Sequence, residues 1–211
     1  MNKIKAVLFD MDGVLIDAKD WHYEALNKSL NLFGYEIMRT EHLSTYDGLP
    51  TSTKLEKLSV EKGLPKKLHS FINEMKQHYT VQIIHNKCRP CFNHEYALSM
   101  LKAQGYRIAC CSNSIRMTIE MMMEYAKLDS YLEFIISNQD VKKSKPDPEI
   151  YLKAMDKMRL KPGECLIVED NENGIKSALA SGGHLLIVKD VSEVNYENIK
   201  KRIAEIEGDV Q

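Results

Sequence analysis

Short apolar segments alternate with helical segments over much of the chain, and this alternation constrains the fold more than any other feature. The apolar runs, each ending at a polar residue or at the start of a polar stretch, are 4–9, 107–111, 134–136, 165–168 and 185–188. Continuous apolar runs of this length are typical of parallel strands that are buried on both faces. The sequence therefore predicts an α/β fold, in which helices cover both faces of a parallel sheet.

Helical periodicity separates most of these runs. The segments with apolar residues three or four positions apart are 95–106, 115–128, 147–158 and 172–182. Gly105 marks the end of the first segment, and Pro148 stands in the first turn of the third. The strand–helix alternation thus extends over the whole second half of the chain.

Residues 16–85 interrupt this alternation because they are rich in helix formers and contain no convincing strand. Helices are predicted at 21–35, 52–63 and 65–84. We therefore expect a core formed by 1–15 and 86–211, with a helical domain at 16–85 inserted after the first strand.

Composition and charge exclude several classes of protein. The formal net charge is −1, whereas a nucleic-acid partner usually requires a basic excess. No run of 18 apolar residues is present, so no membrane span is expected. The first apolar run is short and ends at Asp10, unlike a signal peptide. The odd number of cysteines, five, without a secretion signal favours reduced thiols in a cytoplasm.

Acidic residues follow two of the predicted strands. Asp10 and Asp12 come after the first strand, and Glu169 and Asp170 come after the fourth apolar run. The carboxyl ends of parallel strands meet at one edge of a sheet, where ligands bind. Neighbouring carboxylates repel one another unless a cation or a shared proton is present. Hard carboxylate oxygens favour Mg²⁺, so the sequence predicts a magnesium site there.

A serine and a lysine supply the complementary chemistry. The hydroxyl of Ser112 and the ammonium of Lys145 suit a phosphate group. An aspartate can attack phosphorus as a covalent nucleophile, and a second carboxylate can act as general acid and base. These residues predict an enzyme that acts on a small-molecule phosphate ester.

Four segments in order resemble the haloacid dehalogenase superfamily, and within it the branch of β-phosphoglucomutase and phosphoglycolate phosphatase. They are FDMDGVLID at 9–17, CCSNS at 110–114, SKPDPEIY at 144–151 and VEDNENGIKSA at 168–178. The resemblance extends from about residue 4 to about residue 190. It implies a Rossmann-like core with a mobile helical cap, which agrees with the predicted insertion.

The resemblance also implies roles for the two leading acids. Asp10 would be the nucleophile that becomes an aspartyl phosphate. Asp12 would be the general acid and base, and its backbone carbonyl would also bind Mg²⁺. An aspartate at this second position favours phosphate esters within the superfamily, because an alkoxide leaving group needs a proton.

The remaining motifs correspond to phosphate and metal binding. Ser112 would donate a hydrogen bond to the phosphoryl group, helped by the backbone at Asn113. Lys145 would bridge the nucleophile and the phosphate. The expected magnesium ligands are Asp10, Asp12, Glu169 and Asp170.

The chain matches the mutase pattern only in part. His22 occupies the position of a histidine that assists the mutase, but Ala18 replaces a hinge threonine. Thr51 stands where a cap arginine would grip a second phosphate, and Lys54 lies one turn later. We therefore expect a phosphatase for a sugar or polyol phosphate, with Thr51 and His22 contacting substrate. A sugar-phosphate mutase is the alternative, and a non-catalytic binding protein a more distant one.

Two further questions stay open at this point. The segment 85–94 has His85, Cys88, Cys91 and His94 at three-residue spacing, which includes zinc-ligand types but is poor spacing for one tetrahedral site. We expect this segment to return the chain from the cap to the core. The sequence does not distinguish a monomer from a homodimer.

Overall fold

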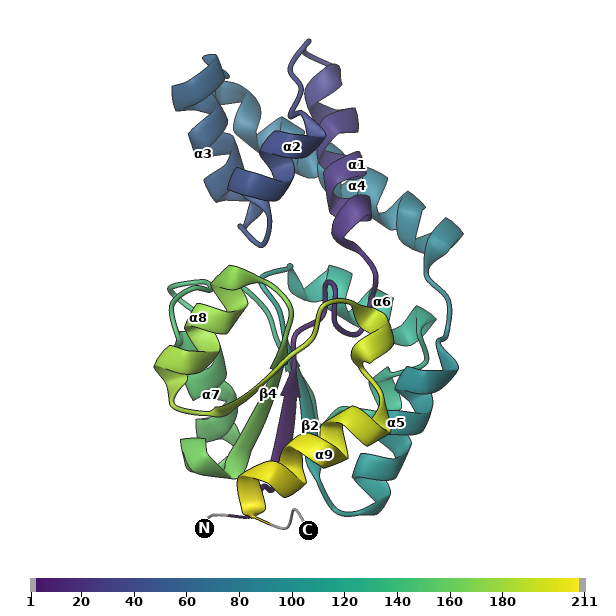
Figure 1. The fold of residues 1–211 in the computed structure, drawn as a ribbon. Helices are drawn as coiled ribbons and strands as arrows, with labels where there is room; N and C mark the ends of the chain where they lie inside the picture. The colour runs from purple at the N-terminus through teal and green to yellow at the C-terminus, as the bar shows by residue number, and fades with distance from the viewer. Residues whose placement is uncertain (1–2, 209–211) are drawn as a thin grey trace. The chain divides into compact units, whose positions relative to one another are not determined.

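The computed structural model describes residues 3–208 and divides into two compact units (Figure 1). Unit 1 consists of Met1–Asp17 and Arg89–Gln211, and unit 2 of Ala18–Cys88. Unit 2 is thus an insertion between the first strand and the rest of unit 1. None of the helices in the described part of the chain is both long and apolar enough to cross a membrane.

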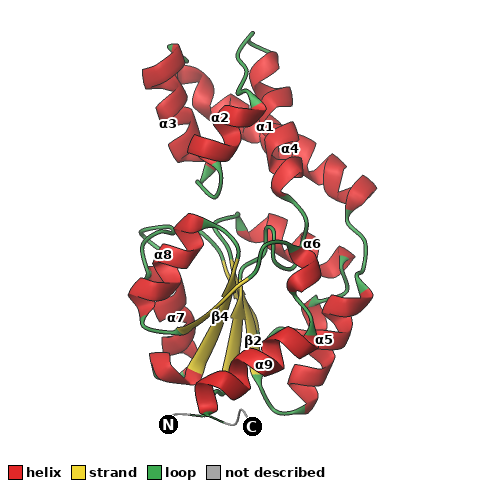
Figure 2. Cartoon of the chain, viewed as in Figure 1, coloured by secondary structure: helices red, strands yellow, loops and turns green. Residues whose placement is uncertain are grey.

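A parallel sheet forms the centre of unit 1 (Figure 2). Its strands, in the spatial order β3-β2-β1-β4-β5, are β1 (Ala6–Phe9), β2 (Arg107–Cys111), β3 (Phe134–Ile136), β4 (Cys165–Glu169) and β5 (His184–Ile187). All four pairings are parallel, and Phe9 at the end of β1 lies opposite Cys110 and Val168. The α/β fold class predicted from the sequence is confirmed.

Helices cover both faces of this sheet (Figure 1). One face is covered by α7 (Glu149–Met158) and α8 (Glu172–Ser181), and the other by α5 (Phe92–Ala103), α6 (Arg116–Tyr125) and α9 (Tyr196–Glu207). Successive strand residues point to opposite faces, so Leu8 packs in the cluster beneath α7 while Phe9 is buried on the opposite side. Burial on both faces explains why the strands are apolar without alternation.

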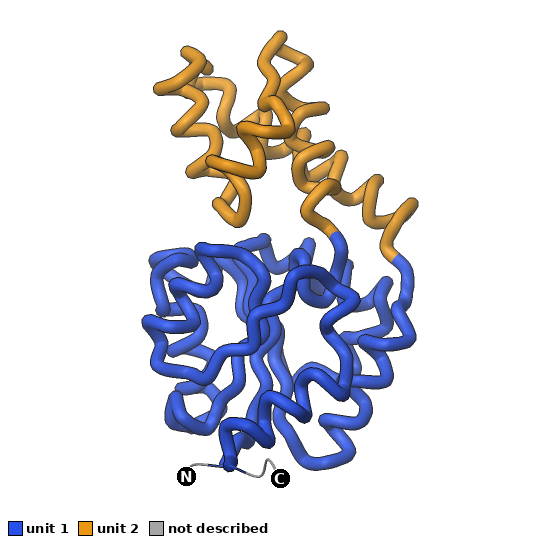
Figure 3. Tube along the Cα trace, viewed as in Figure 1, with its two compact units in different colours: residues 1–17, 89–211 blue, residues 18–88 orange. Residues whose placement is uncertain are grey.

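The secondary structure of unit 2, residues 18–88, consists of helices joined by turns and loops (Figure 3). Its helices are α1 (Lys19–Asn31), α2 (Arg39–Glu41), α3 (Thr51–Lys62) and α4 (His69–Lys87), with a π-helical turn at His42–Tyr46 and a 3₁₀ turn at Lys66–Leu68. A separate apolar cluster that includes Leu26, Leu58 and Ile72 holds these helices together. Tyr46 lies in this cluster, and its hydroxyl donates a hydrogen bond of 2.5 Å to Glu61. The unit therefore has its own core.

Candidate active site

Asp10 is the first residue after the central strand of the sheet. Its amide donates a hydrogen bond of 3.0 Å to the carbonyl of Val168, so the backbone is held against the neighbouring strand β4. The Asp10 side chain is buried. Glu169, the last residue of β4, and Ser112, the first residue after β2, lie at the same edge because the strands run parallel.

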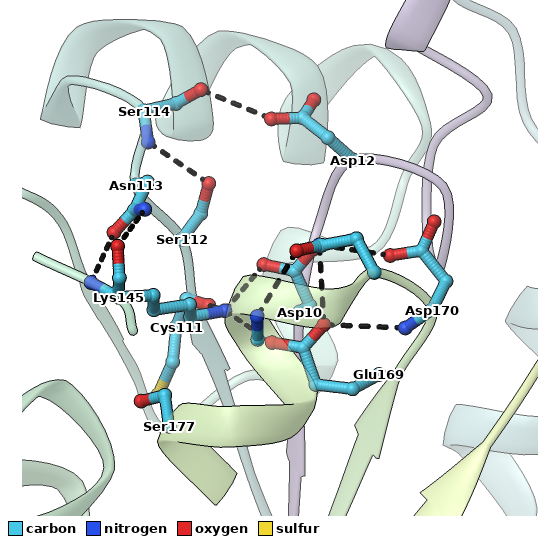
Figure 4. Close-up of polar contacts among 12 residues, drawn as sticks. Asp10, Asp12, Cys111, Ser112, Asn113, Ser114, Lys145, Glu169, Asp170 and Ser177 are labelled. Carbon is cyan, nitrogen blue, oxygen red and sulfur yellow. Dashed lines mark hydrogen bonds and ion pairs between the residues drawn. The ribbon is translucent and has the colours of Figure 1, made fainter. Parts of the chain in front are cut away.

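The side chain of Lys145 extends to this edge of the sheet from the segment 137–148, which joins β3 to α7 (Figure 4). Its Nζ lies 2.7 Å from Oδ1 of Asp10 and 2.7 Å from Oε1 of Glu169. It also donates a hydrogen bond of 2.8 Å to the carbonyl of Cys111. The side chains of Lys145, Asp10 and Glu169 are at most 6% exposed, so their charges interact with little screening by water.

The charges in this group do not balance. Burial alone would lower the pKa of Lys145, but Asp10 and Glu169 raise it above its usual value, so the ammonium stays charged. Burial and the negative charge of Glu169 raise the pKa of Asp10, although Lys145 opposes them. Within residues 3–208, one buried ammonium faces several carboxylates at this edge, which leaves room for another cation.

The donor set fits a magnesium ion. Asp10, Glu169 and Asp170 each place a carboxylate oxygen within 4.8 Å of the others. Oxygen ligands of this kind are those that Mg²⁺ prefers. Of the four predicted ligands, three therefore converge through their side chains. The side chain of Asp12 is not part of this group. The resemblance implies instead that Asp12 binds Mg²⁺ through its backbone carbonyl.

The Asp12 side chain is held separately. It follows β1 in a tight turn in which Gly13 has a φ of 90°, a conformation that favours glycine. The hydroxyl of Ser114 donates a hydrogen bond of 3.1 Å to Oδ2 of Asp12, and the amide of Ser114 donates one of 3.1 Å to the hydroxyl of Ser112 (Figure 4). The loop after β2 thereby orients Asp12 and Ser112 together.

Asn113 links the loop after β2 to the lysine. The amide of Lys145 donates a hydrogen bond of 3.0 Å to Oδ1 of Asn113, and Nδ2 of Asn113 donates one of 3.2 Å to the carbonyl of Lys145. From α8, the hydroxyl of Ser177 donates a hydrogen bond of 2.8 Å to the carbonyl of Asp147. These contacts fix the backbone from which Lys145 extends.

The structure adds participants that the sequence did not indicate. Tyr151 on α7 is fully buried and donates a hydrogen bond of 2.5 Å to Oε1 of Glu169. Gly174 at the start of α8 leaves space for the Glu169 carboxylate, because a Cβ there would lie 2.0 Å from Oε1. Tyr151 is the last residue of the motif SKPDPEIY. An aromatic residue on a predicted helix usually indicates core packing, so the sequence gives no sign of its contact with Glu169.

The predicted cap residues lie in unit 2. Nδ1 of His22, on α1, lies 3.3 Å from Nζ of Lys76, on α4. Thr51 is the first residue of α3, and Lys54 in the same helix is buried, as is Lys76. The roles of His22 and Thr51 in substrate binding stay predictions, since these residues belong to the other compact unit.

The histidine–cysteine segment gives no support for a zinc site. His94 is buried and its Nε2 donates a hydrogen bond of 2.9 Å to the carbonyl of Val191. Cys91 is exposed, whereas Cys88 is buried at the end of α4.

Comparison with known proteins identifies the family. The sequence profile described as haloacid dehalogenase-like hydrolase matches residues 7–188, which include β2 to β5 and all of β1 except its first residue. The chain belongs to this family. The resemblance inferred from the four motifs is therefore confirmed, and so is the expectation of a hydrolase-type enzyme.

Named phosphatases are among the curated relatives of this chain. The chain is 27% identical over 186 residues to the pyrophosphatase PpaX of Bacillus cereus (strain B4264), covering 85% of this chain and 81% of the relative. It is 26% identical over 199 residues to the phosphoglycolate phosphatase of Aquifex aeolicus, covering 90% and 91%. One relative is thus named as a pyrophosphatase and the other as a phosphatase.

Solved structures support the fold. A β-phosphoglucomutase from Clostridium difficile superposes with a TM-score of 0.82 at 23% identity, covering 96% of this chain and 98% of that one. CbbY from Rhodobacter sphaeroides, in complex with phosphate, superposes with a TM-score of 0.79 at 20% identity, covering 87% and 85%. At these identities the match concerns the fold alone.

Proposed function

We propose that this protein is a magnesium-dependent phosphatase that hydrolyses a small phosphorylated metabolite of the sugar or polyol phosphate type. The observation that carries the proposal is the buried group at the carboxyl edge of the sheet, where Lys145 contacts Asp10 and Glu169 directly. A nucleophilic carboxylate, a fixed cation and a set of acidic metal ligands are the parts that phosphoryl transfer requires.

In the first half-reaction, a carboxylate oxygen of Asp10 attacks phosphorus. A bond forms between this oxygen and phosphorus, and the bond from phosphorus to the ester oxygen breaks. Asp12 gives its proton to the departing alkoxide, so an alcohol leaves. Lys145 neutralises charge on the nucleophile and phosphoryl group, and Ser112 donates a hydrogen bond to a phosphoryl oxygen.

In the second half-reaction, water attacks the phosphorus of the aspartyl phosphate. Asp12, now ionised, takes a proton from this water. The bond between phosphorus and Asp10 breaks, which releases inorganic phosphate and regenerates the carboxylate. The hydrogen bond from Ser114 to Asp12 orients the carboxyl group for both proton transfers.

Magnesium is proposed to bind through Asp10, Glu169, Asp170 and the backbone carbonyl of Asp12. When bound, it would supply positive charge for the phosphoryl oxygens. The clustering of the three side-chain carboxylates supports this assignment.

The names of the relatives support a hydrolytic reaction, but they do not identify a substrate for this chain. One is named as a pyrophosphatase and another as a phosphoglycolate phosphatase, and these act on different phosphate compounds. The substrate is therefore proposed as a class, the sugar or polyol phosphates, and not as one compound.

A sugar-phosphate mutase is the second candidate. Thr51 stands where the mutase pattern has a cap arginine, and this substitution weighs against a mutase. The structure buries Lys54 and Lys76 in unit 2, and Lys76 lies against His22. These two lysines are candidate cations for the second phosphate of a bisphosphate intermediate.

A phosphate-release assay over a panel of phosphate esters tests the main proposal, run with Mg²⁺ and with a chelator. Release that requires Mg²⁺ is expected, and no release from any ester would refute the phosphatase. Phosphorus NMR of a sugar 1-phosphate incubated with the protein and a bisphosphate primer tests the mutase. Isomerisation without free phosphate would favour the mutase over the phosphatase.

A further inference from the structure

Tyr151 contacts two of the charged residues at the candidate site. Its hydroxyl donates a hydrogen bond of 2.5 Å to Oε1 of Glu169. Nζ of Lys145 lies 4.8 Å from the centroid of its ring. The side chain is fully buried, and a phenol keeps its proton at neutral pH because its ordinary pKa is about 10. The phenol is therefore a fixed donor beside the lysine.

The two oxygens of Glu169 have different environments. Oε1 accepts short hydrogen bonds from Tyr151 at 2.5 Å and from Lys145 at 2.7 Å. Oε2 accepts longer ones, from the amide of Asp170 at 3.2 Å and from Nδ2 of Asn171 at 3.4 Å. Each oxygen thus accepts two hydrogen bonds, but the pair at Oε2 is longer and therefore weaker. Oε2 is the oxygen that a cation can bind more readily, because less is lost when its hydrogen bonds are displaced.

The backbone of α8 closes the remaining space around this carboxylate. A Cβ at Gly174 would lie 2.0 Å from Oε1 and 2.1 Å from Oε2, so both oxygens lie directly against the first turn of the helix. Glu169 itself is fully buried. Packing limits translation of the carboxylate, but a hydrogen bond is needed to set its rotation about the bond to its carbon chain.

We propose that Tyr151 is a positioning residue for the metal site, because it holds Oε1 of Glu169 toward Lys145 and leaves Oε2 for Mg²⁺. This inference rests on the magnesium site within the proposed function. Without the phenol, Lys145 is the single short donor to Oε1, and the carboxylate can turn that oxygen toward the metal. Residues that orient a ligand in this way typically change metal affinity 10–100-fold when they are replaced.

The test is calorimetric titration of Mg²⁺ into the full-length protein without any phosphate ester. Tyr151→Phe keeps the ring and its contact with Lys145 but removes the hydroxyl. We expect the Kd for Mg²⁺ to rise about tenfold. A Kd equal to that of the wild type would overturn the inference, as would a wild-type protein that binds no Mg²⁺.

Tyr46→Phe is the matched control. Tyr46 is also buried and donates a hydrogen bond of 2.5 Å to a carboxylate, that of Glu61 in unit 2. Both variants should lower the melting temperature, but Tyr46→Phe should leave the Kd for Mg²⁺ unchanged. A rise of equal size in both variants would mean that general loosening causes the effect, and would refute the role of Tyr151.

A double-mutant cycle with Glu169→Gln keeps the inference testable if Tyr151→Phe is poorly stable. Because Tyr151 is proposed to act through Glu169, its replacement should have no further effect on the Kd when Glu169 is already glutamine. A second tenfold rise in that background would contradict the inference. Since calorimetry needs no substrate, a protein that binds Mg²⁺ but hydrolyses no ester would refute the proposed function and leave this inference standing.

Discussion

Lys145 and Asp10 are 135 residues apart in the sequence, yet Nζ of the lysine lies 2.7 Å from Oδ1 of the aspartate with both side chains buried. A buried charge is costly unless it is paired. The pair therefore makes folding of the site depend on the same residues that are proposed to carry out the chemistry. Stability and turnover are therefore measured separately in variants of these residues.

Replacing the proposed nucleophile should abolish turnover without unfolding the protein. Asp10→Asn keeps a side chain of the same shape that can still accept a hydrogen bond from Lys145. It cannot form an aspartyl phosphate, so phosphate release should fall by at least about a thousandfold. Asp156→Asn, an exposed change on α7, is the control and should retain activity. Substantial release by Asp10→Asn would refute the assigned nucleophile.

Removing the lysine should destabilise the fold. Lys145→Met preserves the length of the side chain but leaves Asp10 and Glu169 buried without their cation. We expect the free energy of unfolding in urea, measured with a chelator present, to fall by about 3–5 kcal/mol.

The neighbouring Lys143 provides the matched control, because its side chain is 75% exposed. Lys143→Met should change the free energy of unfolding by no more than about 0.5 kcal/mol. Equal values for the two variants would show that the buried ion pair is not needed for stability.

An alanine at Gly174 should be harmful although the residue lies in a helix. Glycine to alanine within a helix normally stabilises by about 0.5–1 kcal/mol. Here the new Cβ would lie 2.0 Å from Oε1 of Glu169, so the carboxylate must move. We expect a net loss of about 1–3 kcal/mol in urea unfolding, together with weaker Mg²⁺ binding.

Lys176→Ala, on the exposed surface of the same helix, controls for helix propensity. It should leave Mg²⁺ binding unchanged. A Gly174→Ala protein that is more stable than the wild type and binds Mg²⁺ equally well would contradict the predicted close contact.

Asp140 should make stability depend on acid pH. Burial alone would raise its pKa, but the hydroxyl and amide of Ser137 and the guanidinium of Arg116 outweigh this and lower the pKa to about 2. The ordinary pKa of an unfolded aspartate is about 3.9. Because the folded value is the lower one, the stabilisation is fully present above about pH 4 and is lost as the pH falls through about 2.

The measurement compares the wild type with Asp140→Asn in urea at neutral and acid pH. The variant should be less stable by about 1–2 kcal/mol at pH 7, after allowance for partial exposure to solvent. This difference should shrink between about pH 4 and pH 2, as the wild-type carboxylate takes up a proton. A difference independent of pH would show that the ionised form of Asp140 is not what Ser137 and Arg116 stabilise.

The sequence was sufficient to predict the sheet because its signals are local. Apolar runs such as 165–168 mark strands that are buried on both faces, and the polar residues that follow them must lie at one edge of a parallel sheet. This rule alone predicts that Asp10, Glu169 and Asp170 lie at one edge of the sheet. The same reasoning cannot assign donors to individual oxygens, because hydrogen-bond partners depend on side-chain positions.

Tyr151 and Asn113 illustrate what remained hidden. In the sequence, Tyr151 is one more apolar residue on a helix face, and its polar function depends on Glu169 lying opposite its hydroxyl. Asn113 was expected to contribute through its backbone, whereas its side chain also binds both backbone groups of Lys145. The sequence by itself determined the α/β class and the chemical types at the sheet edge, since hydrophobic periodicity and residue type are properties of the chain. Tertiary structure alone decided which oxygen of Glu169 meets Tyr151 and Lys145, because that choice arises only when α7, α8 and the strand ends pack around one buried charge.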